Sequence, residues 1–148
     1  AATKPSIAAQ PLNLSASGVI VLISKCKLTQ FNGIYCNAYN YLPNAIPDFI
    51  YLDGPDINEI NNSINGIKLS SGQKYPPLNS DILKMEYFLN PGTIIVVDGR
   101  SSNSLFLKNN FQRDWTHRYN NFNDQNYFIL NEKTNGVKSK KLINFYNS

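Results

Sequence analysis

Two aspartates stand directly after apolar segments that the sequence predicts to be β-strands. Asp53 follows Asp48–Leu52, and Asp98 follows Thr93–Val97, a run that is almost entirely β-branched. A continuous apolar run without polar alternation is typical of a strand covered on both faces, as in the middle of a parallel sheet. The carboxyl ends of such strands lie at one edge of the sheet, where open α/β sheets bind their ligands. We therefore expect Asp53 and Asp98 to face one site.

Two carboxylates at one sheet edge suit a hard divalent cation such as Mg²⁺, which keeps several waters and needs only one or two protein carboxylates. Asp56 and Asn103 could add oxygen ligands for the cation or contacts to a substrate. A bound cation would orient a substrate hydroxyl and favour its deprotonated form. The alternative is that an aspartate after a strand only caps the next turn through its side chain. For the pair, the sequence favours the functional interpretation.

Two arginines are candidates for contacts to an anionic substrate. Arg100 lies two residues after Asp98 and could bind such a group bidentately, in a catalytic role beside Asp53 and Asp98. The alternative role for Arg100, an ion pair with Asp98 or Asp56, is at least as well supported by the sequence. Arg113 is predicted to contribute to substrate binding at the edge of the site.

His117 and Trp115 are weaker candidates. His117 could act as a general base, but it alternates with Trp115 and Tyr119 on a predicted strand, a pattern more typical of a surface or half-buried residue. Trp115 could frame the edge of a site and is more often a core anchor. A single histidine excludes a two-histidine metal site, and two cysteines are too few for a zinc site or a disulfide framework.

The elements that would position these residues alternate between strand and helix. Strand, helix and strand from Asp48 to Val97 form a βαβ unit, which is expected to be parallel and right-handed. An antiparallel hairpin is expected after the last helix. The predicted segments are strands at Gly18–Ser24, Ile34–Tyr39 (after an Asn32-Gly33 turn), Asp48–Leu52, Thr93–Val97, Trp115–Tyr119 and Tyr127–Leu130; helices at Ser80–Leu89 and from Ser101 or Ser102 to about Asn110; and a short strand or docked tail at Leu142–Tyr146.

Length and composition predict one folded domain. The 148 residues are 42% hydrophobic, and no apolar run approaches the roughly 20 residues that cross a bilayer. We expect a cytoplasmic protein, with a flexible leader at residues 1–17 and one domain at residues 18–148. A net charge of +4 is compatible with nucleic acid, but a solvated basic face and a lysine-rich tail explain it better. Neither a nucleic acid nor a membrane is an expected partner.

Three strings in the sequence carry a family resemblance. DFIYLDGPD, then PPLNSDILKMEYFLNPGTIIVVDGRSSNSLFLKNNFQRDW, and then YFILNE resemble the C-terminal half of a bacterial family of class I methyltransferase-like proteins that depend on S-adenosylmethionine (SAM). The match runs from about Leu22 to Phe145, and IVVDGR…N..FLK..FQR.W is its most specific part. The resemblance implies a Rossmann-like α/β fold with a mostly parallel seven-stranded sheet and a C-terminal antiparallel hairpin.

The resemblance also implies a function and a site. In metal-dependent O-methyltransferases of this fold, acidic residues after strands four and five hold magnesium, and Asp53 and Asp98 match them. Gly99 stands where an asparagine usually follows the second aspartate. The family's first strand, glycine-rich loop and ribose-binding acidic residue should precede Val19, and only the leader stands there. The domain is therefore expected to be truncated at its N-terminus and incomplete for SAM binding.

Two functional hypotheses follow. The first is a methyltransferase-like domain that transfers a methyl group from SAM to a small molecule or sugar, with magnesium assisting. The second is a non-catalytic remnant or partner-binding α/β domain. Missing strands would leave a sheet edge uncovered, which predicts self-association.

Overall fold

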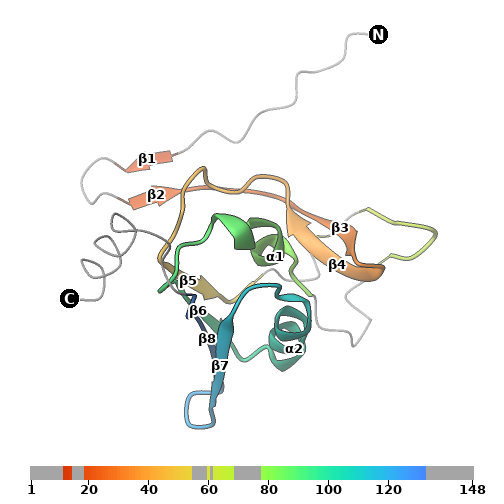
Figure 1. The fold of residues 1–148 in the computed structure, drawn as a ribbon. Helices are drawn as coiled ribbons and strands as arrows, with labels where there is room; N and C mark the ends of the chain where they lie inside the picture. The colour runs from red at the N-terminus through yellow and green to blue at the C-terminus, as the bar shows by residue number, and fades with distance from the viewer. Residues whose placement is uncertain (1–11, 15–18, 55–59, 61, 69–77, 133–148) are drawn as a thin grey trace, which may run out of the picture.

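The computed structural model describes residues 12–14, 19–54, 60, 62–68 and 78–132, and the described residues form eight strands and two short α-helices (Figure 1). In chain order the elements are β1 (Leu12–Leu14), β2 (Val19–Val21), β3 (Cys26–Phe31), β4 (Ile34–Tyr39), β5 (Phe49–Leu52), α1 (Asp81–Met85), the 3-10 helix η2 (Glu86–Phe88), β6 (Ile94–Asp98), α2 (Ser101–Asn110), β7 (Trp115–Asn120) and β8 (Gln125–Leu130). No described helix has the length and apolar character to cross a membrane.

A mixed sheet of four strands, in the order β5-β6-β8-β7, supports the candidate site. β5 and β6 run parallel, with Leu52 beside Val97. β8 is antiparallel to β6 on one side and to β7 on the other. The predicted parallel pair and the predicted terminal hairpin are both confirmed. β5 and β6 therefore end at the same edge of the sheet.

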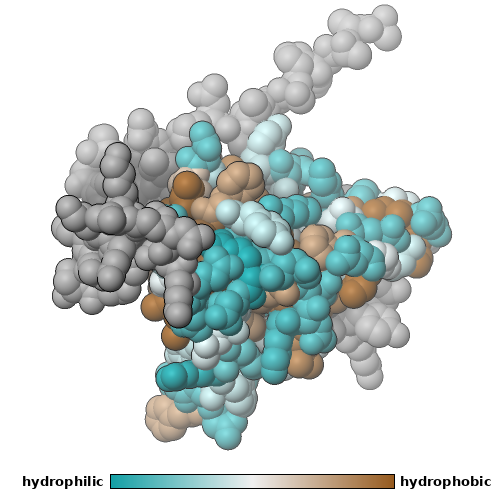
Figure 2. Space-filling model, in the orientation of Figure 1, coloured by the Kyte–Doolittle hydropathy of each residue, from teal (hydrophilic) through white to brown (hydrophobic). Residues whose placement is uncertain are grey.

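The two faces of this sheet have different surroundings. One face packs against α1 and α2, and its residues Leu52, Ile95, Val97 and Phe128 belong to the same buried cluster as Ile82, Leu83, Phe106 and Leu107. On the opposite face Phe49 and Tyr51 are 56% and 50% exposed, whereas Val96 beside Tyr51 is 5% exposed. Side chains of a strand alternate between faces, so each strand sends every second residue into the core. Figure 2 shows apolar side chains reaching the surface in separate groups among hydrophilic ones.

A hairpin of β3 and β4 lies next to α1 (Figure 1). Asn32 and Gly33 connect the strands with φ angles of 49° and 78°, both in the left-handed region that an Asn-Gly turn tolerates. The predicted turn and the predicted strand Ile34–Tyr39 are confirmed. Asn37 joins the hairpin to the helices, because its N–H donates to Leu78 O at 2.7 Å and its carbonyl accepts from Ser80 N at 3.0 Å.

The expected Rossmann-like α/β class is wrong, because the described residues are mostly β. A Rossmann fold covers both faces of a mostly parallel sheet with helices. Here one pair of strands in the main sheet is parallel, and both described α-helices pack on the same face of the sheet. The strands at Ile34–Tyr39, β5, β6, β7 and β8 occur where they are predicted, whereas β1 and β3 were not predicted. Apolar runs such as Ile94–Val97 fit a mixed sheet as well as a parallel one.

The two predicted helices have different outcomes. α2 occupies Ser101–Asn110, as expected. The predicted helix Ser80–Leu89 is α-helical only as far as Met85 and then tightens into η2. Within η2, Glu86 is buried and Phe88 is 69% exposed. Leu142–Tyr146 lies outside the described residues, as does most of the predicted leader, of which Leu12–Leu14 forms β1.

Candidate functional site

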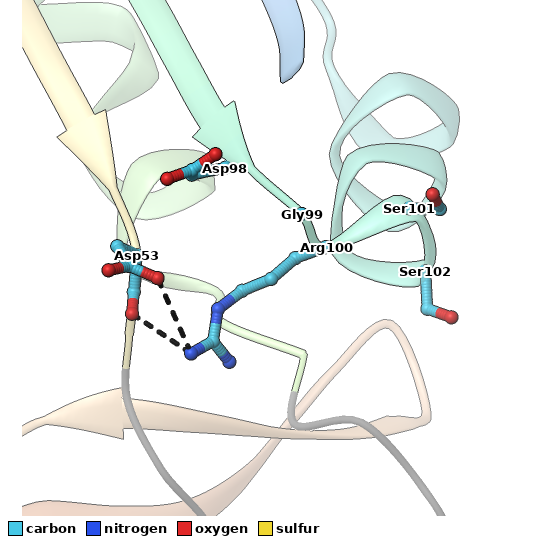
Figure 3. A pocket seen from close by; sticks show the side chains of 6 residues that line it. All are labelled: Asp53, Asp98, Gly99, Arg100, Ser101 and Ser102. Carbon is cyan, nitrogen blue, oxygen red and sulfur yellow. Dashed lines mark hydrogen bonds and ion pairs between the residues drawn. The ribbon is translucent and has the colours of Figure 1, made fainter. Parts of the chain in front are cut away.

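An open cavity of about 600 Å³ lies at the carboxyl ends of β5 and β6 (Figure 3). The described residues that line it are Asp53, Asp98, Gly99, Arg100, Ser101 and Ser102. Asp53 follows β5, Asp98 ends β6, and Gly99, with a φ of +55°, turns the chain into α2. The structure therefore brings Asp53, Asp98 and Arg100 together, as the sequence predicts. The side chains of Ser101 and Ser102 point away from Asp53.

Asp98 is held in place by two side chains from the neighbouring strands. Tyr51 Oη donates to Asp98 Oδ2 in a short hydrogen bond, and Gln125 Nε2 donates to Oδ1 at 3.4 Å. Sheet register explains both contacts, because Asp98 lies opposite Gln125 and Tyr51 lies beside Val96. A carboxylate has about four acceptor positions. Asp98 therefore keeps room for a further donor from a ligand.

The hydrogen bond to Asp98 raises the pKa of the Tyr51 hydroxyl above its ordinary value, because ionisation would remove the donated proton and place two negative charges together. The bond contributes stability below the ordinary tyrosine pKa, and this stability is lost as the pH rises through the pKa of the folded state. Asp98→Asn is expected to lower the pKa of Tyr51 toward the ordinary value.

A pH titration of tyrosine Cζ chemical shifts by NMR measures this change. Tyr119 provides an internal control, since its pKa is raised by its own hydrogen bond to Asp124 and should not respond to Asp98→Asn. A Tyr51 pKa that is the same in the variant and the parent would contradict the contact.

Arg100 reaches across the cavity to the end of β5 (Figure 3). Its Nη2 donates to the backbone carbonyl of Asp53 at 2.9 Å and lies 3.8 Å from Asp53 Oδ1. The sequence offered Asp98 or Asp56 as ion-pair partners for Arg100, and the structure shows Asp53; Asp56 lies outside the described residues. The Asp53 side chain stays 66% exposed, so this ion pair contributes little to stability.

The cavity fits neither of the two groups expected from the resemblance. A guanidinium 3.8 Å from Asp53 Oδ1 would repel a divalent cation at that oxygen, and Asp98 already accepts two protein donors. Within the described residues no group of three or more potential metal ligands occurs. Among the described residues, the lining also has no apolar or aromatic side chain against which the adenine of SAM could pack. The described residues therefore do not form a magnesium or SAM site.

Two of the predicted substrate-binding residues lie elsewhere. Asn103 is fully buried, and its Oδ1 accepts from Asn79 N at 3.0 Å. Arg113 forms a bidentate ion pair with Glu132, at 3.0 and 2.7 Å, and donates to the carbonyls of Glu86 and Leu89. Both residues hold parts of the chain together and do not line the cavity.

Trp115 and His117 line a separate cavity of about 270 Å³, together with Lys108, Phe111, Arg113 and Phe128. Trp115 stacks on Phe111, and its Nε1 donates to Glu86 Oε1 at 2.9 Å. The His117 ring stacks on Phe128 and lies 2.9 Å from Asn126 Oδ1. His117 is half-buried and Trp115 packs against the core cluster, and neither lies among the residues that line the cavity of Asp98.

Sequence reasoning missed the two side chains that hold Asp98. Tyr51 precedes Asp53 by two residues, and the two-residue period of a strand places it on the same face of the sheet as Val96 and Asp98. That signal was readable in the sequence. The partnership with Gln125 was not, because it depends on β8 lying next to β6.

Comparisons with known proteins leave the chain without a relative: no protein-family model, no curated protein and no solved structure matches it. The resemblance to methyltransferases therefore stays a prediction from the sequence. The function must be argued from the geometry of the cavity.

Proposed function

We propose that the chain binds a small, hydroxyl-rich molecule, a sugar or a sugar acid, at the carboxyl ends of β5 and β6. The observation that carries the proposal is the described part of the cavity lining, in which two carboxylates and one guanidinium meet and no described apolar side chain takes part. Hydroxyl groups donate to carboxylates and accept from guanidinium N–H groups, so such a lining matches a polyol. An apolar ligand would gain nothing there.

The individual roles follow from the contacts. Asp98, held by Tyr51 and Gln125, is positioned to accept a hydrogen bond from a ligand hydroxyl and, in a reaction, to take its proton as a general base. Arg100 is positioned to donate to a ring oxygen or to the carboxylate of a sugar acid. Asp53 fixes the position of Arg100.

Methyl transfer to the bound hydroxyl is the finer proposal, and the family resemblance supports it. The described residues of the cavity would bind and orient the acceptor only, because they offer no wall for the adenine of SAM, so the methyl donor would have to bind outside them. The alternative is a non-catalytic domain that binds the same ligand without chemistry. Calorimetric titration of SAM into the folded chain separates the two: heat of binding supports the methyltransferase, and its absence supports the binding domain.

Ligand binding can be tested directly by saturation-transfer NMR with glucose, glucuronate and myo-inositol. We expect at least one of them to bind and Asp98→Asn to weaken its binding about tenfold, since a hydrogen bond to a charged group contributes about 1.5 kcal/mol. Asp48→Asn is the matched control, because Asp48 is exposed just before β5, at the end opposite the cavity, and its replacement changes the net charge equally. The proposal fails if no probe binds or if both variants weaken binding alike.

A further inference from the structure

The outer edge of β5 is unpaired within the part of the chain that the structure describes. β5 hydrogen-bonds to β6 on one side and is the terminal strand of the sheet. The N–H of Ile94 donates to Asp48 O at 2.9 Å, which shows that Asp48 directs its backbone groups toward β6. Backbone groups alternate along a strand. Ile50 and Leu52 therefore also face β6, whereas Phe49 and Tyr51 direct their N–H and C=O groups outward.

The side chains of this edge do little to prevent pairing with another strand. Natural proteins protect edge strands with lysines, prolines or bulges. β5 has the sequence FIYL, with no charge, no proline and no glycine, and Pro47 precedes it without interrupting it. Phe49 and Tyr51 are also exposed, on the face of the sheet away from α1 and α2. An edge with these properties is a surface for strand addition.

We propose that two copies of this chain associate through β5, antiparallel about a two-fold axis at Ile50. Phe49 of each copy then lies opposite Tyr51 of the other, and the outward backbone groups of these residues form two hydrogen bonds per pair, four in all. The register places the aromatic rings of Phe49 and Tyr51 on the same face, where cross-strand aromatic pairs are favourable. Only this strand direction makes the edge complementary to itself, which is the condition for a closed dimer.

The expected dimer is weak. Four residues of one strand bury less than the roughly 1,200 Å² of a stable interface. The segment before β5 adds exposed apolar side chains, since Tyr41, Leu42 and Ile46 are 56%, 41% and 59% exposed. We therefore expect a dissociation constant on the order of 10 µM, a modest affinity. The inference stands apart from the proposed function, because the pairing uses the outer edge of β5 and leaves the cavity lining unchanged.

Sedimentation velocity of the full chain over a range of concentrations tests the inference. The expected result is a reversible shift from monomer to dimer. Phe49→Pro removes an outward N–H that makes no bond to β6, so the fold should be retained. Each copy of the dimer contributes one Phe49 N–H, so the variant dimer loses two of its four hydrogen bonds. This loss should weaken the dimer about tenfold or more.

A second variant keeps the test decisive if Phe49→Pro does not fold. Phe49→Lys preserves the backbone and places two like charges at the new strand pair, and it should also abolish the dimer. Tyr87→Lys is the matched control, because Tyr87 is an aromatic residue with 72% exposure on η2 and should leave the dimer intact. A chain that is monomeric at all concentrations, or a dimer that survives Phe49→Lys, would overturn the inference.

Discussion

Replacing Glu86 with alanine is expected to lower the free energy of unfolding by about 4 kcal/mol, as removal of a buried charged partner typically does. Glu86 is 1% exposed, and its carboxylate accepts hydrogen bonds from three donors. Gln112 N and Arg113 N donate at 3.0 and 2.9 Å to Oε1, and Trp115 Nε1 donates to the same oxygen at 2.9 Å. Alanine would leave all three donors without this acceptor. Urea denaturation followed by far-ultraviolet circular dichroism measures the loss.

Two further variants test whether the loss of stability comes from the lost hydrogen bonds and not from a substitution in this segment as such. Glu86→Gln keeps one acceptor oxygen but brings an N–H₂ group toward the donors, so we expect an intermediate loss of about 2 kcal/mol. Tyr87→Ala changes the adjacent, largely exposed residue and should alter stability by no more than about 0.5 kcal/mol. If the Glu86→Ala and Tyr87→Ala variants unfold at the same urea concentration, the hydrogen bonds to the Glu86 carboxylate do not stabilise the fold.

Phe128→Ala is the second substitution with a large expected effect, a loss of about 4 kcal/mol. Phe128 is 1% exposed at the centre of β8. Its ring lies edge-on to Phe111, with centroids 5.3 Å apart, and stacks on His117 with centroids 4.7 Å apart. Alanine would remove these contacts and leave a cavity between the sheet and α2. Thermal unfolding followed by calorimetry would report a lower melting temperature.

Phe122→Ala is the matched control for Phe128→Ala, because Phe122 is 96% exposed in the turn between β7 and β8. The same chemical change there should move the melting temperature very little. A typical domain of this size has a total stability of about 5–15 kcal/mol, so the Phe128 variant would lose a large share of it. Equal changes in melting temperature for Phe128→Ala and Phe122→Ala would contradict the placement of Phe128 in the buried core.

Local elements were predictable where short-range chemistry decides them. The β-branched run before Asp98, the Asn32-Gly33 turn and the helix Ser101–Asn110 all occur where the sequence predicts them. The helix Ser80–Leu89 was overestimated, because its C-terminal half is shaped by the distant backbone that binds Glu86. No window of local sequence contains that information.

The candidate site was also predictable in part, as far as it depends on residues that are close in sequence or end predicted strands. Asp53 and Asp98 meet because each ends one of two parallel strands, and Arg100 follows within two residues. Asn103 is near Asp98 in sequence, but the turn of α2 carries it to the buried side of the helix. Arg113 forms an ion pair with Glu132, which follows β8 at the end away from Gln125 and Asp98.

By itself the sequence determined the strands that end at Asp53 and Asp98, the Asn32-Gly33 turn and the terminal hairpin, because backbone sterics and side-chain branching act within a few residues, but it did not predict β1 or β3. Only the tertiary structure decided that β8 lies between β6 and β7, that Tyr51 and Gln125 hold Asp98, and that both described α-helices pack on one face of the sheet. These properties depend on which distant segments share a core, and one apolar pattern is compatible with several such arrangements. The expected Rossmann-like class was wrong at this level, while the strands that led to it were right.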